Sequence, residues 1–465
     1  MPNSEPIFWP IADLTAAYQA GTLSPVEVTT DALARIDAFD AELHSYLLVT
    51  PDLAIEQARD AQDRYYAKTS PLPALLGVPL SIKDLFDVSG EPTTLGSRAY
   101  GQDSATSDSI PVAHLRSAGA VFLGKSNTAE FGQSATTENL LGPDCGNPWD
   151  PGRTSGGSSG GAAASVGAGL ATAALGSDGG GSIRIPAAMC GMFGIKPTFA
   201  RAPKEATFHA MTEFVCAGPI TRSVADARLL LSIQLGRELP QVPLAERRRI
   251  AWCASPLDRA VDPEITRAAT VAVQRLIELG YQVEEVNLPL TGWLEAFGPL
   301  VLADEWHYRG HLLEGSPDQL TRYVRKGIEA GAAVTGPEIA AALIAKAEFG
   351  ARVEALFDSF DALITPTTAC VAFPIGQRPT HIDGHKVDPL WGPFPFTAAF
   401  NVSGSPAASV PVGFSEGMPV GLQVIGAHHR ENLVLDVCED IEQVVGFPGD
   451  QLIQRWGRSE VHGVR

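Results

Sequence analysis

Short apolar runs alternate with longer amphipathic stretches from one end of the chain to the other. The short runs have the length of buried strands, and the longer stretches carry apolar residues at helical spacing. We expect strands at residues 76–84, 120–123, 362–364, 407–412 and 420–425. We expect helices at residues 11–20, 110–117 and 431–445, and over most of residues 294–357. This alternation predicts an α/β protein in which helices cover both faces of a sheet.

Three helix starts carry capping residues. Residues 24–27, Ser-Pro-Val-Glu, predict a capping box with proline in the first turn. Ser223 begins another helix, and the Asp-Pro pair at 262–263 begins a third that ends at Gly280. Around this third helix, residues 249–289 form a strand–helix–strand unit, which predicts two parallel strands.

The chain shows neither a linker-like boundary nor an internal repeat. At 465 residues it is long enough for several small domains, but the continuous pattern favours one large α/β domain over 1–465. Within this domain, a helical segment at about 10–67 is expected to pack on the core.

Composition and charge exclude several classes of function. Hydrophobic residues make up 45% of the chain and charged residues 19%, which is typical of a protein with a sizeable core. The net charge of −19 argues against a nucleic-acid-binding surface, which needs clustered Lys and Arg. No apolar run is long enough to span a bilayer, and no Lys or Arg precedes Arg35 to form the basic start of a signal peptide. We therefore expect no nucleic-acid partner and no membrane association.

The six cysteines are far apart and form no C-x-x-C pair. This spacing argues against a zinc site and against a disulfide framework. Buried free thiols suit a reducing compartment, so we expect a cytoplasmic protein without a metal or another cofactor.

Glycine and serine are concentrated in residues 152–186. Two clusters, Gly156–Gly161 and Asp178–Ser182, flank a run of small apolar residues at 162–175 that we expect to be a helix. Successive backbone N–H groups in a glycine-rich turn form a cavity for an anion, and a serine at its end is then placed as a nucleophile beside an oxyanion hole. A pair of purely structural turns is the alternative at this point.

Two known motifs fit this stretch poorly. Residues 156–160 match G-x-S-x-G, but the nucleophile elbow needs an apolar strand before the serine, and residues 147–153 contain two prolines instead. No Gly-Lys-Ser/Thr follows at the spacing of a phosphate-binding P-loop.

A serine nucleophile needs a base, and none of the ten histidines lies in the glycine-rich stretch. Lys83 is a candidate because it ends an apolar strand, where burial lowers the pKa of an amine. The alternative is an ion pair between Lys83 and Asp84 or another carboxylate at the end of the strand.

Together, three segments resemble the amidase signature family: Gly77–Asp84, Gly156–Gly161 and Asp178–Pro186. The resemblance continues through residues 190–198 and 401–411 and covers nearly the whole chain. It implies the amidase signature fold, a large mixed, mostly parallel twisted β-sheet sandwiched between α-helices.

Carried over residue by residue, the resemblance implies that Ser182 is the nucleophile and Lys83 the base. Ser158 becomes the serine that bridges them, which in this family follows a cis peptide bond. An acyl-serine intermediate and a Ser-Ser-Lys triad are the implied chemistry.

The same resemblance implies an oxyanion hole formed by the backbone N–H groups of Gly179, Gly180 and Gly181 together with that of the nucleophile. Asp178 and Arg184 flank this turn, and we expect them to support it through hydrogen bonds. A direct contact between Arg184 and the substrate is the alternative.

Several activities share this family. One is the glutaminase A subunit of a glutamine-dependent aminoacyl-tRNA amidotransferase, in which an Asp seven residues before the Asn of the C-terminal motif helps to hold glutamine. Phe394 takes that position here, within an aromatic segment at 390–396 that either lines the site or belongs to the core. An uncharged aromatic lining favours a hydrolase of aryl, alkyl or anilide-type amides, with esters as a further class.

The alternatives are a non-catalytic binding protein on the same fold and the amidotransferase glutaminase. The expected partner is a small-molecule amide substrate, and a homodimer is the assembly to be tested. The sequence suggests that part of the acyl specificity lies in residues 294–400.

Overall fold

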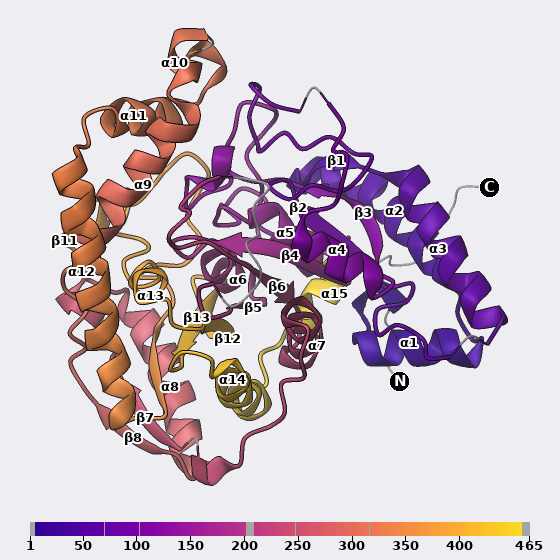
Figure 1. The fold of residues 1–465 in the computed structure, drawn as a ribbon. Helices are drawn as coiled ribbons and strands as arrows, with labels where there is room; N and C mark the ends of the chain where they lie inside the picture. Colours follow the sequence, from indigo (N-terminus) through magenta and orange to yellow (C-terminus); the bar gives the residue numbers. More distant parts are fainter. Residues whose placement is uncertain are drawn as a thin grey trace.

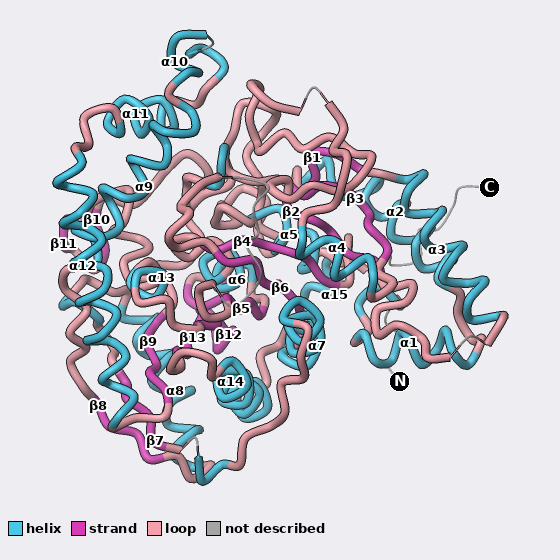
Figure 2. The backbone as a smooth tube through the Cα atoms, viewed as in Figure 1, coloured by secondary structure: helices cyan, strands magenta, loops and turns pink. Residues whose placement is uncertain are grey.

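The computed structural model describes residues 5–68, 70–101, 103–200, 209–246, 248–315 and 317–457. Within these residues, a sheet of 11 strands runs through the molecule (Figures 1 and 2). Its strands lie in the order β1 (Tyr46–Val49), β3 (Val121–Ser126), β2 (Pro79–Lys83), β4 (Ala173–Asp178), β6 (Cys216–Thr221), β5 (Phe193–Lys196), β12 (Ala407–Ser415), β13 (Met418–Ile425), β9 (Ala362–Pro366), β7 (Arg249–Trp252) and β8 (Gln282–Glu285). A separate two-stranded hairpin consists of β10 (His381–Ile382) and β11 (His385–Lys386).

The sheet is mixed, as expected, but it is not mostly parallel. Among the described strands, β2–β3, β2–β4, β7–β8 and β7–β9 are parallel, and the remaining neighbours are antiparallel. The expectation of a mostly parallel sheet is therefore wrong. Part of the reason is local, because β12 and β13 are joined by a turn at Glu416 and Gly417, both with positive φ. A connection this short joins only antiparallel strands.

Helices cover both faces of the sheet. In chain order they are α1 (Ile11–Ala20), α2 (Pro25–Leu43), α3 (Pro51–Tyr66), α4 (Ile110–Ser117), α5 (Gly160–Gly167), α6 (Arg184–Cys190), α7 (Val224–Leu235), α8 (Pro263–Glu278), α9 (Trp293–Arg309), α10 (His311–Gly315), α11 (Arg322–Gly331), α12 (Gly336–Glu354), α13 (Ala399–Val402), α14 (Glu431–Val445) and α15 (Asp450–Trp456). Apolar residues of α7, α8 and α14 form one core cluster with the strands of the C-terminal half, and those of α9, α12 and α13 form another with the same strands. Figure 1 shows α1–α3 and α9–α12 at opposite ends of the molecule.

Several helix starts and strands lie where the sequence predicted them. α2 begins with the expected capping box, in which Ser24 and Glu27 exchange hydrogen bonds with each other's backbone. The expected parallel unit is β7–α8–β8, with Asp262 capping α8. The strand expected at 76–84 forms β2, which starts at Pro79.

The helix expected at 162–175 is wrong in its second half. α5 ends at Gly167, and residues 173–178 form β4, a fully buried strand between β2 and β6. Gly169 has a φ of 64°, and a Cβ there would lie 2.2 Å from the Phe8 ring, so the chain turns at this glycine. Small residues that fit a helix in the sequence are here part of a central, buried strand.

No single helix in the described ranges is long and apolar enough to cross a bilayer, and one pair, Arg322–Gly331 with Gly336–Asp358, bent by 104°, meets the length and composition criteria together.

The N-terminal helices are tied to the rest of the chain by one buried arginine. Arg35, on α2, donates hydrogen bonds to the carbonyls of Gly169 at 2.7 Å, Ala168 at 2.9 Å and Trp456 at 2.9 Å. It also pairs with Glu5. Its guanidinium therefore joins α2 to the end of α5 and to α15.

We expect Arg35→Ala to lower the free energy of unfolding by about 3 kcal/mol or more, because three buried carbonyls lose their donor. If 1–465 is one domain, urea unfolding followed by circular dichroism and tryptophan fluorescence should shift as one transition. Arg267→Ala on the exposed face of α8 is the control, with an expected change within about 0.5 kcal/mol. A separate early transition in the Arg35 variant would instead make residues 10–67 an independent unit.

Candidate active site

The candidate catalytic residues meet at the carboxyl ends of two neighbouring strands. β2 and β4 are parallel, so Lys83, which ends β2, and Asp178, which ends β4, come to the same edge of the sheet. α5 packs against both strands and begins at Gly160, directly after Ser158 and Ser159. Residues from three segments of the chain are thus brought to one edge of the sheet.

The Lys83 amine is fully buried among hydroxyl groups. Its Nζ lies 2.7 Å from Ser158 Oγ, 2.8 Å from Ser159 Oγ and 3.0 Å from Ser177 Oγ. Burial lowers the pKa of Lys83 well below its usual value, and the negative charge of Asp178 opposes this effect without cancelling it. The site therefore favours the neutral amine.

The alternative ion pair between Lys83 and Asp84 does not form. Asp84 instead pairs with Lys125, with 2.7 Å between Asp84 Oδ1 and Lys125 Nζ, and both side chains are buried. Asp84 also accepts the Thr94 backbone N–H at 3.1 Å. Its charge is thus directed at Lys125 and the loop after β2.

Ser158 follows a cis peptide bond, formed with Gly157, as the resemblance implied. Gly157 packs on the backbone of Thr136 so closely that a Cβ would lie 2.6 Å from the Thr136 carbonyl carbon. A Cβ at Gly132 would lie 3.4 Å from Ser158 Oγ. Ser158 thus has glycines close to it at positions 132 and 157. At position 157, the Thr136 backbone leaves no room for a side chain.

The glycine turn after β4 offers N–H groups of two kinds. The N–H of Gly181 donates to Asp178 Oδ1 at 2.8 Å. The N–H groups of Gly179, Gly180 and Ser182 have no acceptor among the described residues. The expected oxyanion hole included Gly181, whose N–H is occupied, so the donors available to a ligand are the other three.

A hydroxyl from the C-terminal half fixes the shape of this turn. Thr397 Oγ1 donates to the Gly180 carbonyl at 2.7 Å. Gly181 has a φ of 125°, and a Cβ there would lie 2.2 Å from the same Thr397 oxygen. Position 181 therefore requires glycine.

Asp178 and Arg184 support the turn, as expected, and both are fully buried. Arg184 Nε and Nη2 each lie 2.9 Å from an Asp178 carboxylate oxygen. Burial alone would raise the pKa of Asp178, but the charge and hydrogen bonds of Arg184 hold it well below its usual value. Because all these donors point at Asp178 or at the protein, nothing in this arrangement aims Arg184 at a substrate.

Two polar residues missed by the sequence interpretation complete this network. Asn401 accepts from Arg184 Nη2 at 2.6 Å and donates to Asp178 Oδ1 at 2.8 Å. Gln423 accepts from Arg184 Nη1 at 2.6 Å. Asn401 lies in the segment 401–411 and Gln423 in the segment 419–423, which also resembles the family; this was the available signal, but their partners are more than 200 residues away in the sequence.

The backbone of Ser182 is bonded to that of Ser159, the residue after Ser158, but no hydrogen bond joins the Ser182 and Ser158 hydroxyls. The Ser182 carbonyl accepts the Ser159 N–H at 3.2 Å, which holds the two serine segments together. The Ser182 residue keeps 7% of its surface exposed, and among the described residues its hydroxyl has no hydrogen-bond partner. No described protein group therefore fixes the orientation of this hydroxyl.

Metal ligands do not cluster in the described part of the chain. No group of three or more His, Cys, Asp or Glu side chains there is placed to hold an ion, and the six cysteines are free thiols. The absence of a metal and of a cofactor stays a prediction.

Comparison with known proteins identifies the family. A family model described as Amidase matches residues 27–435. The chain belongs to the amidase signature family. It is an amidase, an enzyme that hydrolyses amide bonds.

Relatives of two kinds are similar to this amidase. It is 32% identical to an acylamidase of Rhodococcus erythropolis, over 95% of this chain and 97% of the relative. It is 34% identical to the A subunit of a glutamyl-tRNA(Gln) amidotransferase from Chloroflexus aurantiacus, over 92% of this chain and 95% of the relative. The crystal structure of a bacterial aryl acylamidase of the same family matches with a TM-score of 0.87 and 28% identity, over 98% of this chain and all of that one.

Aromatic side chains of the amidase face the glycine turn. A Cβ at Gly180 would lie 3.2 Å from Phe297 Cζ and 3.6 Å from Trp391 Cη2. The two rings meet edge to face, with centroids 5.6 Å apart, and Trp293 packs on Trp391 at 5.3 Å in the same manner. Phe297 and Trp293 come from α9; Phe297 lies within the region expected to carry specificity, and Trp293 directly precedes it.

The sequence left open whether the aromatic segment 390–396 lines the site or belongs to the core, and the structure shows residues of both kinds. Phe394 and Phe396 are fully buried in a core cluster. Trp391 is only partly buried and faces Gly180. Phe394, the position compared with the glutamine-holding Asp, is therefore a core residue.

A buried carboxyl group on α9 was not predicted. Glu305 Oε1 accepts from Gln133 at 2.5 Å and from Arg309 at 2.8 Å, whereas its Oε2 has no partner among the described residues. Burial raises the pKa of Glu305 to about 7, and the charge of Arg309 opposes that rise only in part. No sequence signal links Glu305 to Gln133, since 172 residues separate them.

We expect Glu305 to make the amidase less stable as the pH rises. The folded protein binds a proton at Glu305 up to about pH 7, whereas the unfolded chain releases it near the usual glutamate pKa, so stability falls between about pH 4.5 and 7. Glu305→Gln, which mimics the protonated group, should reduce the fall between pH 5 and pH 8 by roughly 3 kcal/mol in urea titrations. Glu278→Gln on exposed α8 is the control, and an unchanged pH slope in the Glu305 variant would contradict the raised pKa.

Proposed function

We propose that this amidase hydrolyses aryl, alkyl or anilide-type carboxylic amides through an acyl-Ser182 intermediate, with Lys83 as the base and Ser158 as the bridge. The observation that carries the proposal is the buried Lys83 amine, which has a lowered pKa and lies 2.7 Å from Ser158 Oγ. A neutral amine in this position is a base, whereas a charged one is not.

The hydrogen bonds around Lys83 support a defined direction of proton transfer. The Ser159 hydroxyl donates to the Ser177 carbonyl at 3.1 Å, so it accepts from Lys83. A neutral amine has two N–H donors and one lone pair. If Ser159 and Ser177 accept the two donors, the lone pair is left for the Ser158 hydroxyl.

Acylation then proceeds in one relay. Lys83 takes the proton of Ser158, and Ser158 takes the proton of Ser182 as the Ser182 oxygen attacks the amide carbon. The N–H groups of Gly179, Gly180 and Ser182 stabilise the oxyanion, and each such donor is worth about 3 kcal/mol in comparable sites.

The relay runs in reverse to complete the reaction. Ser158 returns a proton to the leaving amine, the C–N bond breaks, and Ser182 is left as an ester. Water, activated by the same relay, attacks this ester, releases the carboxylic acid and restores the Ser182 hydroxyl.

The rings of Phe297, Trp391 and Trp293, here called the aromatic wall, favour substrates with uncharged acyl or amine groups. Phe297 and Trp391 face Gly180, and the position compared with the glutamine-holding Asp carries the buried Phe394. The acylamidase relative and the aryl acylamidase structure agree with this preference. Esters, whose carbonyl chemistry is similar, are a further substrate class.

The second candidate is the glutaminase component of an amidotransferase. Its support is a similarity of 34% identity to such a protein, next to 32% to the acylamidase. This candidate requires glutamine turnover and partner subunits. A homodimer and a cytoplasmic location stay predictions.

We expect Ser182→Ala to abolish both anilide hydrolysis and labelling by a fluorophosphonate probe, because the nucleophile is removed. Lys83→Ala and Ser158→Ala should lower kcat/KM by about a thousandfold, the usual contribution of a positioned base. Peptide mass spectrometry locates the label, and circular dichroism checks the fold. Ser165→Ala, a buried serine outside the site, is the control. Near-normal turnover by Lys83→Ala would contradict the assignment of the base.

The pH dependence of kcat/KM is an independent test of the protonation state of the Lys83 amine. As the pH rises through its lowered pKa, the neutral amine forms, so kcat/KM should rise over the same interval. Lys83→Arg stays charged, and its activity should not recover at high pH. A wild-type profile without this rise would sink the neutral-amine mechanism.

A substrate panel separates the two candidate functions. We expect kcat/KM for acetanilides and for alkyl amides to exceed that for glutamine by about a hundredfold or more, since the position compared with the glutamine-holding Asp carries no carboxylate. Release of aniline or ammonia is measured with the purified chain alone. Faster turnover of glutamine than of every anilide would favour the amidotransferase component.

A further inference from the structure

A pocket of about 600 Å³ has Trp391 in its lining, the same tryptophan that lies close to Gly180 in the glycine turn. It is enclosed by the loop at 255–261, the start of α9 and the chain from β10 to Pro395. Its volume is typical of a small-molecule site. Trp391 takes part in both places, because its Cη2 lies against Gly180 while the ring also lines the pocket.

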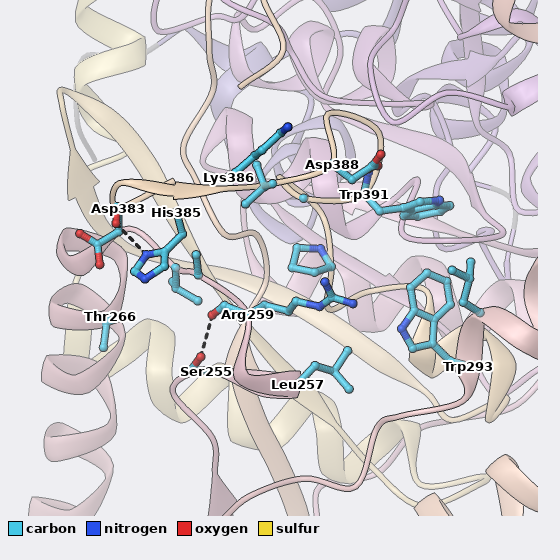
Figure 3. Close-up of a pocket in the computed structure, with 16 residues that line it drawn as sticks. Ser255, Leu257, Arg259, Thr266, Trp293, Asp383, His385, Lys386, Asp388 and Trp391 are labelled. Atoms are coloured by element: carbon cyan, nitrogen blue, oxygen red, sulfur yellow. Dashed lines mark hydrogen bonds between the residues drawn. The ribbon is translucent and has the colours of Figure 1, made fainter. Parts of the chain in front are cut away.

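One end of this pocket is apolar and aromatic. Trp293 and Trp391 form an edge-to-face pair there, and Pro395 and Leu257 line the same pocket. Figure 3 shows Arg259 reaching across the pocket toward this pair. A planar or alkyl group that fills this end would therefore lie next to a guanidinium.

The Arg259 side chain is exposed, and among the described residues its guanidinium has neither a hydrogen bond nor an ion pair. Asp388 also lines the pocket, and its Oδ1 accepts the N–H groups of Leu390 and Trp391 at 2.9 Å each, but no ion pair joins it to Arg259 among the described residues. Asp383 and His385 lie at the opposite end of the pocket, away from Trp293 and Trp391 (Figure 3).

We propose that this pocket is an outer subsite that binds the carboxylate of an amide substrate whose far end carries an acidic group on an aryl or alkyl spacer. The tryptophan pair holds the spacer, and Arg259 pairs with the carboxylate in the two-pronged geometry that a guanidinium favours. The inference rests on the proposed hydrolysis of aryl and alkyl amides and names the members of that class that the enzyme prefers.

The test uses binding, so it does not depend on turnover. The probes are 3-phenylpropanoate and 3-phenylpropanol, which share the aryl spacer, differ in charge and contain no amide. Isothermal titration calorimetry on the wild-type enzyme should give a Kd about tenfold lower for the carboxylate, which is the usual worth of one charge-assisted pair. Arg259→Gln should bring the ratio of the two Kd values to about one, and Arg259→Lys should retain part of it.

Two further variants assign the effect to this pocket. Trp391→Ala should weaken both probes alike, because it removes the surface that holds the spacer and leaves Arg259 in place. Arg275→Gln, an exposed arginine of α8 paired with Glu278, should keep the wild-type ratio. Equal affinities of the two probes for the wild type, or an unchanged ratio in Arg259→Gln, would overturn the subsite. Failure to hydrolyse any anilide would overturn the proposed function. It would not change the binding result, because the two probes contain no amide and their Kd values decide the subsite independently of turnover.

Discussion

The complete burial of one amine, that of Lys83, is the constraint on which the site depends. Three of the described lysines are buried in this enzyme, and their neighbours differ. Lys125 has the Asp84 carboxylate at 2.7 Å, and Lys196 has backbone carbonyls, including that of Ser405 at 2.6 Å. Lys83 alone of the three is surrounded by serine hydroxyls, which accept or donate protons without a formal charge. Burial without a carboxylate in contact favours the neutral form of Lys83, and Ser158 lies 2.7 Å from this amine.

The Asp178–Arg184 pair protects that neutral state as well as the turn. Asp178 lies close enough to Lys83 to favour its protonated form. Arg184 binds both carboxylate oxygens of Asp178, so much of this negative charge is compensated within the pair. The same carboxylate accepts the Gly181 N–H, which orients the turn. One buried ion pair thus acts on Lys83 and on the glycine turn.

The aromatic residues and the pocket that we propose to bind the substrate belong to a different part of the molecule. The triad segments come from residues 79–182, whereas the aromatic wall and the outer pocket come from residues 255–395. Thr397, Asn401 and Gln423 connect the two parts through hydrogen bonds to the glycine turn and to Arg184. Changes in the wall can therefore alter the substrate while the network behind the turn is preserved.

The sequence by itself determined the features that depend on residues close together in the chain, namely helix starts and short motifs. Capping residues at 24–27 and 262–263 set helix starts, and the serine and glycine clusters with Lys83 indicated the family and its chemistry. Only the tertiary structure decided between partners that are distant in sequence. It directed Asp84 to Lys125 rather than to Lys83, engaged the Gly181 N–H with Asp178, and made residues 173–178 a central strand. Small apolar residues fit a helix or a buried strand equally well, and a buried charge takes whichever partner the fold brings near. These outcomes follow from packing and desolvation, which no local pattern encodes.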